Sequence, residues 1–179
     1  MPTVSSTSFG LVIAFVLPGF ACLLSLAWWS STLRDILGTF STSRSNVGLF
    51  LLVFIGVLLT GMLTSGVRWL VFERWLLKEW SLEGADFGRL SAADGTLIAF
   101  RAAVDEHYRY HQFWGGIFVV LPISFVGWLT YYSPNLGALK IAIGCVLAML
   151  GWGLTFLGGK QSFCRYSDRA RAILKGVSG

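Results

Sequence analysis

The chain alternates between long apolar stretches and shorter polar ones. Four stretches of at least 20 residues carry charges only near their ends, and they occupy residues 9–29, 47–69, 113–132 and 136–157. A helix of about 20 apolar residues crosses the ~30 Å hydrocarbon core of a bilayer. The pattern therefore predicts an all-α integral membrane protein with four transmembrane helices, and we expect residues 1–179 to form a single membrane domain.

The composition supports this prediction. Hydrophobic residues make up 55% of the chain and charged residues 13%, whereas soluble domains carry about 25% charged residues. The first stretch is not typical of a signal peptide, which begins with basic residues and has a shorter apolar core. No basic residue precedes it, and it ends in Trp28 and Trp29. We therefore expect it to be retained as the first helix.

Basic residues are distributed unequally between the two sides of the predicted membrane. Three of the 14 Lys and Arg residues lie on one side: Arg34, Arg44 and Lys140. The others lie at or beyond the opposite helix ends: Arg68, Arg74, Lys78, Arg89, Arg101, Arg109, Lys160, Arg165, Arg169, Arg171 and Lys175. Because cytoplasmic loops are enriched in Lys and Arg, the loop 70–112, the tail and both termini are predicted to be cytoplasmic.

The cytoplasmic loop and tail are themselves predicted to be largely helical. Residues 68–80 continue the second apolar stretch, 81–95 form a glycine-containing connector, and 96–112 lead into the third stretch. The tail, residues 160–179, has the pattern of an amphipathic helix that lies on anionic lipid headgroups. Its candidate headgroup ligands are Arg165, Arg169, Arg171 and Lys175.

Small residues form a stripe along the fourth apolar stretch. Glycine recurs there every seven residues, and the stripe comprises Gly137, Gly144, Ala148, Gly151, Thr155 and Gly158. Small residues allow two membrane helices to approach closely. The stripe is predicted to be a helix-packing interface, either with the third helix of the same chain or with another subunit.

Candidate chemistry is concentrated just before the third stretch, in the run RAAVDEHYRYHQFW. Arg101, Asp105 and Arg109 are spaced four apart and could form ion pairs along one helix face. His107 and His111, with the same spacing, could bind a metal if Cys164 or Asp168 approached from the tail. Arg101 and His107 also match the loose Arg–His spacing of HEPN ribonucleases, so Arg101, His107 and His111 are the weak catalytic candidates.

Other function classes are disfavoured. No ionisable residue lies deep within an apolar stretch, which argues against a proton-coupled transporter. The loop from Arg68 to Gln112 balances six basic residues against seven acidic ones, so no nucleic-acid partner is expected. No motif indicates a bound cofactor, and the cysteines Cys22, Cys145 and Cys164 are expected to be reduced thiols.

Three segments together resemble a family of small, uncharacterised bacterial four-span inner-membrane proteins. They are FGLVIAFVLPGF near the start, SGVRWLVFERW after the second stretch, and AFRAAVDEHYRYHQFW at the opening of the third. The family shares a Pro-Gly pair in its first span and a His-Tyr-Arg-Tyr-x-Gln-Phe run. This chain has Trp114-Gly115-Gly116 where the family has a smaller aromatic residue and then asparagine. The resemblance implies a bacterial inner membrane and no particular activity.

Three functional hypotheses follow from the sequence. The first is a non-enzymatic membrane component that assembles with itself or a protein partner, as a scaffold or as a membrane-perturbing effector in bacterial defence. Its cytoplasmic contact surface would comprise Arg101, Asp105, His107, Arg109 and His111. The second is a cytoplasmic-face hydrolase or HEPN-like ribonuclease that uses Arg101 and His107. The third is a small oligomeric channel.

Overall fold

In the computed structural model, residues 10, 12–40, 46–80, 82, 87–90, 95–132, 134 and 136–176 are described. These residues contain helices and no strand, which confirms the prediction of an all-α chain. The elements are η1 (Val12–Val16), α2 (Leu17–Leu26), α3 (Ser31–Phe40), α4 (Val47–Arg68), η2 (Trp69–Leu76), η3 (Lys78–Trp80), η4 (Phe87–Arg89), α5 (Thr96–Ala103), η5 (Val104–Tyr108), α6 (Arg109–Tyr132) and α7 (Ala138–Gly176). Phe9, Arg44, most of the connector 81–95 and residues 177–179 lie outside the described residues.

Three helices are long and apolar enough to cross a membrane. They are Val47–Leu76 with 30 residues, Thr96–Tyr132 with 37 and Ala138–Gly176 with 39. The first predicted span, residues 9–29, is shorter in the structure, because η1 and α2 together end at Leu26 and rise only about 22 Å. Ser30 then begins a new helix, since its hydroxyl accepts a hydrogen bond from the Leu33 amide at 3.2 Å.

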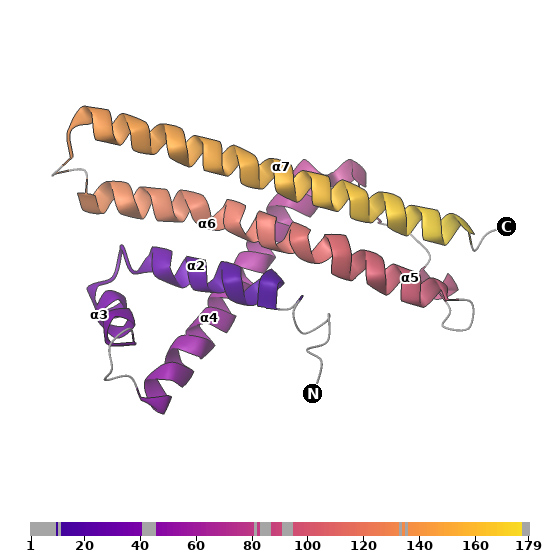
Figure 1. The fold of residues 1–179 in the computed structure, drawn as a ribbon, viewed down its shortest axis with the longest axis horizontal. Helices are drawn as coiled ribbons and strands as arrows, with labels where there is room; N and C mark the ends of the chain where they lie inside the picture. The colour runs from indigo at the N-terminus through magenta and orange to yellow at the C-terminus, as the bar shows by residue number, and fades with distance from the viewer. Residues whose placement is uncertain are drawn as a thin grey trace.

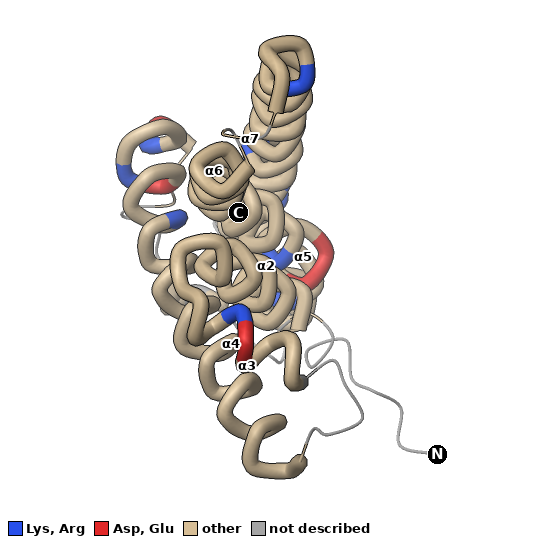
Figure 2. The backbone as a smooth tube through the Cα atoms, turned by 90° about the vertical axis from the view of Figure 1, so that its left-hand side faces the viewer, with Lys and Arg blue, Asp and Glu red and all other residues tan. Residues whose placement is uncertain are grey.

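The helices form an elongated bundle (Figure 1). α6 and α7 lie antiparallel, α2 lies beside α6, and α4 crosses them obliquely. We call the end where α6 connects to α7 the turn end, and the end with η2, α5 and the last part of α7 the basic end. Figure 2, viewed from the turn end, shows that most of α4 and much of α6 and α7 carry no charged residue.

Glycine residues allow η1, α2, α4 and α6 to pack closely. A Cβ atom at Gly19 would clash with the Val57 carbonyl oxygen, and one at Gly61 with the Phe15 carbonyl oxygen. A Cβ at Gly116 would lie 2.8 Å from Pro18 Cβ. Small residues are what permit such close helix crossings where hydrophobic burial gives little driving force.

The small-residue stripe of α7 faces α6 at several positions. A Cβ at Gly144 would lie 2.7 Å from the Trp128 ring, and one at Gly158 would lie 3.0 Å from the Trp114 ring. The nearest contact at Gly151 is Leu121, at 3.8 Å. Thr155 is buried and Ala148 is half-buried, whereas a Cβ at Gly137 would meet no neighbouring atom within 4 Å.

The predicted amphipathic tail is the continuation of α7. Its apolar side is buried, with Phe163 and Ala170 almost inaccessible, and this part of α7 contacts α5 and η5. The face expected to lie on lipid therefore contacts protein. Arg165, Arg169 and Lys175 are exposed, whereas Arg171 is half-buried and donates a hydrogen bond to the Glu79 carbonyl oxygen at 3.2 Å.

Pro122 removes the backbone donor that the Phe118 carbonyl group would have within α6. Because proline has no amide hydrogen, the Phe118 carbonyl oxygen four residues earlier lacks its helical donor. The indole N–H of Trp152 on α7 donates to this oxygen at 3.0 Å. The Trp152 and Phe118 rings also stack, with their centroids 4.8 Å apart. The proline in α6 is thus compensated by a side chain of the neighbouring helix.

We predict that Trp152→Phe destabilises the fold by roughly 1–2 kcal/mol, because the Phe118 carbonyl loses its donor in an apolar environment. Pro122→Ala restores a backbone donor, so the same Trp152→Phe change should cost about 1 kcal/mol less in that background. Unfolding of the four proteins in detergent measures this coupling. Additive effects would show that the indole hydrogen bond contributes nothing.

Candidate functional site

A buried ion pair lies where α4 ends and η2 begins. Arg68 donates from Nη1 to Glu73 Oε1 at 2.6 Å. The Arg68 side chain is almost fully buried, and the Glu73 side chain is only 17% exposed. The two residues are five apart, and the π-helical hydrogen bonding of η2 places such residues on the same side. The local winding of the helix therefore forms the pair.

His111 connects this ion pair to α7. Its Nδ1 lies 2.9 Å from the Gly159 carbonyl oxygen, and its Nε2 lies 3.6 Å from Glu73 Oε1. Because a carbonyl oxygen only accepts hydrogen bonds, Nδ1 must carry a proton. Tyr108 donates a further hydrogen bond to Glu73 Oε1 at 3.1 Å. Residues from α4, η5 and α6 thus meet at the Glu73 carboxylate of η2, and His111 links them to α7.

Aromatic rings and glycines enclose this polar cluster, which we define as Arg68, Glu73, Tyr108 and His111. Phe72 and His111 are fully buried, and the His111 ring lies 4.7 Å from the Phe163 ring between centroids. A Cβ at Gly115 would lie 2.7 Å from Arg68 Cγ, so glycine makes room for the arginine. Gly159 does the same for Phe72 at 3.1 Å.

The titratable groups Glu73 and His111 lie outside the apolar stretches 47–69, 113–132 and 136–157. Burial raises the pKa of Glu73, but the neighbouring His111 imidazole and the Arg68 charge outweigh burial and lower the pKa overall. Burial lowers the pKa of His111 and outweighs the opposing effect of Glu73, and the Arg68 charge lowers the pKa further. Arg68 and Glu73 thus form a buried ion pair, and burial favours the uncharged form of His111 beside it.

The residues predicted from the run before α6 are separated by the fold. His111 is in the buried cluster, whereas Arg101 is exposed and has no ion-pair partner among the described residues. Asp105 and Arg109 form the predicted pair with 3.8 Å between Oδ1 and Nε. Arg109 also donates to the Gln112 side-chain oxygen at 3.2 Å.

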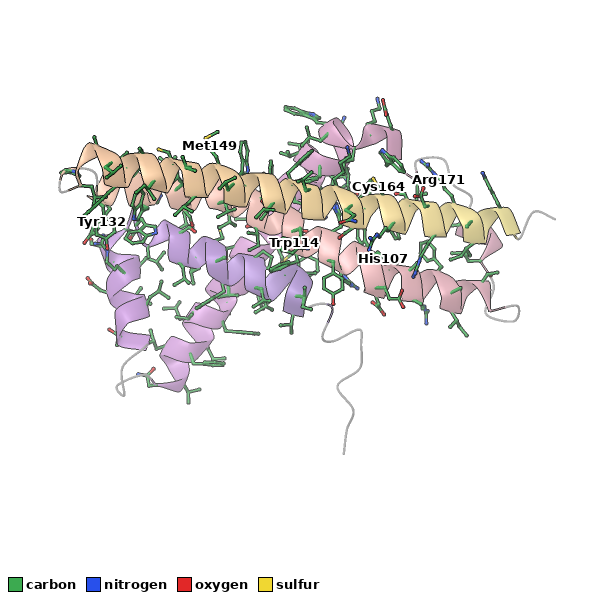
Figure 3. All side chains as sticks on the ribbon, turned by 45° about the horizontal axis from the view of Figure 1, so that its top comes forward. His107, Trp114, Tyr132, Met149, Cys164 and Arg171 are labelled. Atoms are coloured by element: carbon green, nitrogen blue, oxygen red, sulfur yellow. The ribbon has the colours of Figure 1, made fainter. Side chains whose placement is uncertain are left out.

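His107 lies at the basic end and is only half-buried (Figure 3). Burial lowers its pKa, and the charge of Arg169 lowers it further. Arg169 forms an ion pair with Glu106. His107 and His111 therefore have different environments, although their spacing suggested a shared face.

The structure gives no support to the metal hypothesis. Both ring nitrogens of His111 face protein groups, at Gly159 and Glu73. Cys164 is half-buried on α7. Within the described part of the chain, no group of three or more His, Cys, Asp or Glu side chains could hold a metal ion.

Sequence reasoning missed three members of the cluster. In the sequence, Arg68 counted only as one of the basic residues at the helix ends that indicate topology, and Glu73 only as one of the seven acidic residues of the loop. Their spacing of five would have indicated a pair only if the π-helix had been anticipated. Tyr108 carried no signal beyond its place between two histidines.

No protein-family model, curated protein or solved structure matches the chain. The resemblance to small bacterial membrane proteins stays a prediction.

We predict that stability falls as the pH is lowered from 7.5 to 5.5 because of His111. Its lowered pKa means that the unfolded chain binds more protons than the folded chain below about pH 6.5, and this costs at most about 1.4 kcal/mol per pH unit. Glu73, with its lowered pKa, titrates below this window. In thermal unfolding, His111→Asn should reduce the pH dependence, because Asn can still donate to Gly159 but does not titrate.

The matched control is His107→Asn, since the chain has only two histidines. The pKa of His107 is also lowered, so its contribution has the same sign, and we expect it to be smaller because His107 is only half-buried. An unchanged pH dependence in His111→Asn would contradict the assignment.

Proposed function

We propose that this chain is a four-span inner-membrane protein that acts without catalysis, by assembling with itself or with a protein partner. The observation that carries the membrane assignment is the inverted arrangement of polarity. Apolar side chains cover the outward faces of α4 and α7, with Leu63 and Met149 both 72% exposed, and Figure 3 shows Met149 pointing away from the bundle. The charged cluster, in contrast, is buried. Lipid is the solvent that suits such a surface.

Four spans and cytoplasmic termini complete the proposal. The first stretch, residues 9–29, provides the fourth crossing beside the three long helices. The excess of Lys and Arg supports placing the basic end in the cytoplasm. The resemblance to bacterial four-span proteins supports the inner membrane as its location.

The burial of the polar cluster supports a non-enzymatic role. A catalytic histidine must reach a substrate atom, but His111 is fully buried and directed toward Gly159 and Glu73. Arg68 is equally inaccessible and paired within the chain. The cluster is better suited to hold helices together than to bind a substrate.

The outward face of α7 supports self-assembly. Exposed residues recur there with alternating spacings of four and three: Leu139, Ile143, Val146, Leu150, Gly153 and Leu157. This is the repeat of a left-handed helix pair, and no atom lies within 4 Å of a Cβ at Gly153. We propose that a second copy packs on this face, as a scaffold or as a membrane-perturbing effector requires.

Topology is testable with single cysteines in a variant that lacks Cys22, Cys145 and Cys164. Cysteine placed at Ile98 or Lys175 should react with a membrane-impermeant maleimide only after the cytoplasmic side is opened. Cysteine placed at Asn46 should react in intact cells. The opposite labelling pattern would show that the protein has the opposite orientation in the membrane. Labelling of Leu63→Cys from either side would exclude the membrane assignment.

Assembly is testable by disulfide formation between copies in membranes. Cysteine at Val146, Leu150 or Gly153 should crosslink strongly, whereas cysteine at the control position Leu147, which lies off the repeat, should crosslink weakly. Gly153→Leu should decrease crosslinking at Leu150→Cys by several-fold. Uniform or absent crosslinking, together with a monomer mass in detergent, would contradict assembly through α7.

A further inference from the structure

The segment η2–η3, residues 69–80, exposes a second apolar surface at the basic end. Four of its side chains are strongly exposed: Trp75 at 73%, with Trp69, Leu70 and Leu76 between two-fifths and one-half. Two exposed basic residues, Arg74 and Lys78, lie among them. Large exposed aromatic groups beside cations require a partner that offers both hydrocarbon and negative charge.

The opposite side of this segment is fixed to the bundle. Phe72 is fully buried, Leu77 is nearly so, and the Leu77 amide donates to the Phe72 carbonyl oxygen at 2.7 Å. Glu73 is held by Arg68 and Tyr108. The exposed tryptophans therefore cannot turn inward without breaking the buried cluster.

The depth of the segment is set by its contacts. Glu73 faces His111, which lies just before the third apolar stretch, and Phe72 packs on Gly159, which lies just after the fourth. Because α4 crosses the bundle obliquely (Figure 1), η2 emerges beside α7 and does not project far beyond it. These contacts place η2 where the apolar stretches end, which is the headgroup layer of the proposed bilayer.

We propose that residues 69–80 lie in the cytoplasmic headgroup layer and bind anionic phospholipid, with Trp69 and Trp75 at the acyl boundary and Arg74 and Lys78 at the phosphates. This inference rests on the proposed membrane function. Tryptophan rings collect at this depth, and each basic residue near an anionic surface adds attraction. Among the exposed charges of the segment, Arg74 and Lys78 outnumber Glu79, because the fourth charged residue, Glu73, is largely buried and paired with Arg68.

The tail is less suited to this role than the sequence suggested. α7 continues as one helix to Gly176, so Arg165 lies about 9 Å beyond Gly159 along the axis and Lys175 about 24 Å beyond it. Arg169 is engaged by Glu106, and Arg171 donates to the Glu79 backbone. We therefore expect η2–η3, and not the tail, to make most of the direct contacts with headgroups.

Depth measurement with spin labels tests the proposal. In the cysteine-free background, Trp75→Cys, Ile98→Cys and Leu63→Cys are labelled separately and reconstituted in phosphatidylcholine vesicles with or without phosphatidylglycerol. Ile98 on α5 is the matched control, because it is 66% exposed. The label at position 75 should collide more with oxygen than with a water-soluble nickel chelate, whereas the label at 98 should show the reverse. Phosphatidylglycerol should increase the difference at 75, and Arg74→Ser with Lys78→Ser should abolish that increase.

Three results would overturn the proposal, and they are distinguishable. If position 75 is as accessible to the nickel chelate as position 98 while position 63 stays in lipid, residues 69–80 do not contact the headgroups. The proposed membrane function is then unaffected. If the label at position 63 is exposed to water, the proposed membrane function itself is wrong. Protection of position 75 from both reagents indicates a protein partner on η2.

Discussion

The buried charge of Arg68 is the constraint on which the basic end of the structure depends. An arginine removed from water is tolerated only when it is paired and its partner is hydrogen-bonded. Glu73 provides the pair, and Tyr108 donates to the same carboxylate oxygen. His111, facing this carboxylate, is in turn bound to the Gly159 carbonyl of α7. One cation thus fixes η2, η5, α6 and α7 relative to one another.

Glycine provides the space that this arrangement requires. Gly115 admits the stem of Arg68, and Gly159 admits the ring of Phe72. Further along the bundle, Gly19 and Gly61 bring the backbones of α2 and α4 together, and the Thr60 hydroxyl donates to the Gly19 carbonyl oxygen at 2.9 Å. In the proposed bilayer, where hydrophobic burial contributes little, such close approach and short polar contacts would hold the helices together.

These features separate the inside of the molecule from its surface. The polar cluster of Arg68, Glu73, Tyr108 and His111 lies inside the bundle, while the long apolar faces of α4 and α7 remain exposed. Under the proposed function, the cluster secures the helices, α7 contacts a second copy and η2–η3 contacts lipid headgroups. No step requires a reacting group, which is consistent with the inaccessibility of His111 and Arg68.

The sequence by itself determined the helical class and the approximate extent of the long helices, because apolar length and helical periodicity are local properties. It also identified His111 and the small residues of α7 as unusual. Only the tertiary structure decided their partners. The Arg68–Glu73 pair depends on a π-helical turn. The burial of His111 depends on its contact with α7, and the close contacts of Gly144 and Gly158 depend on the aromatic rings of α6. The apolar side of the tail packs on α5 and η5, and not on lipid, since an amphipathic pattern specifies that a face is covered but not by what.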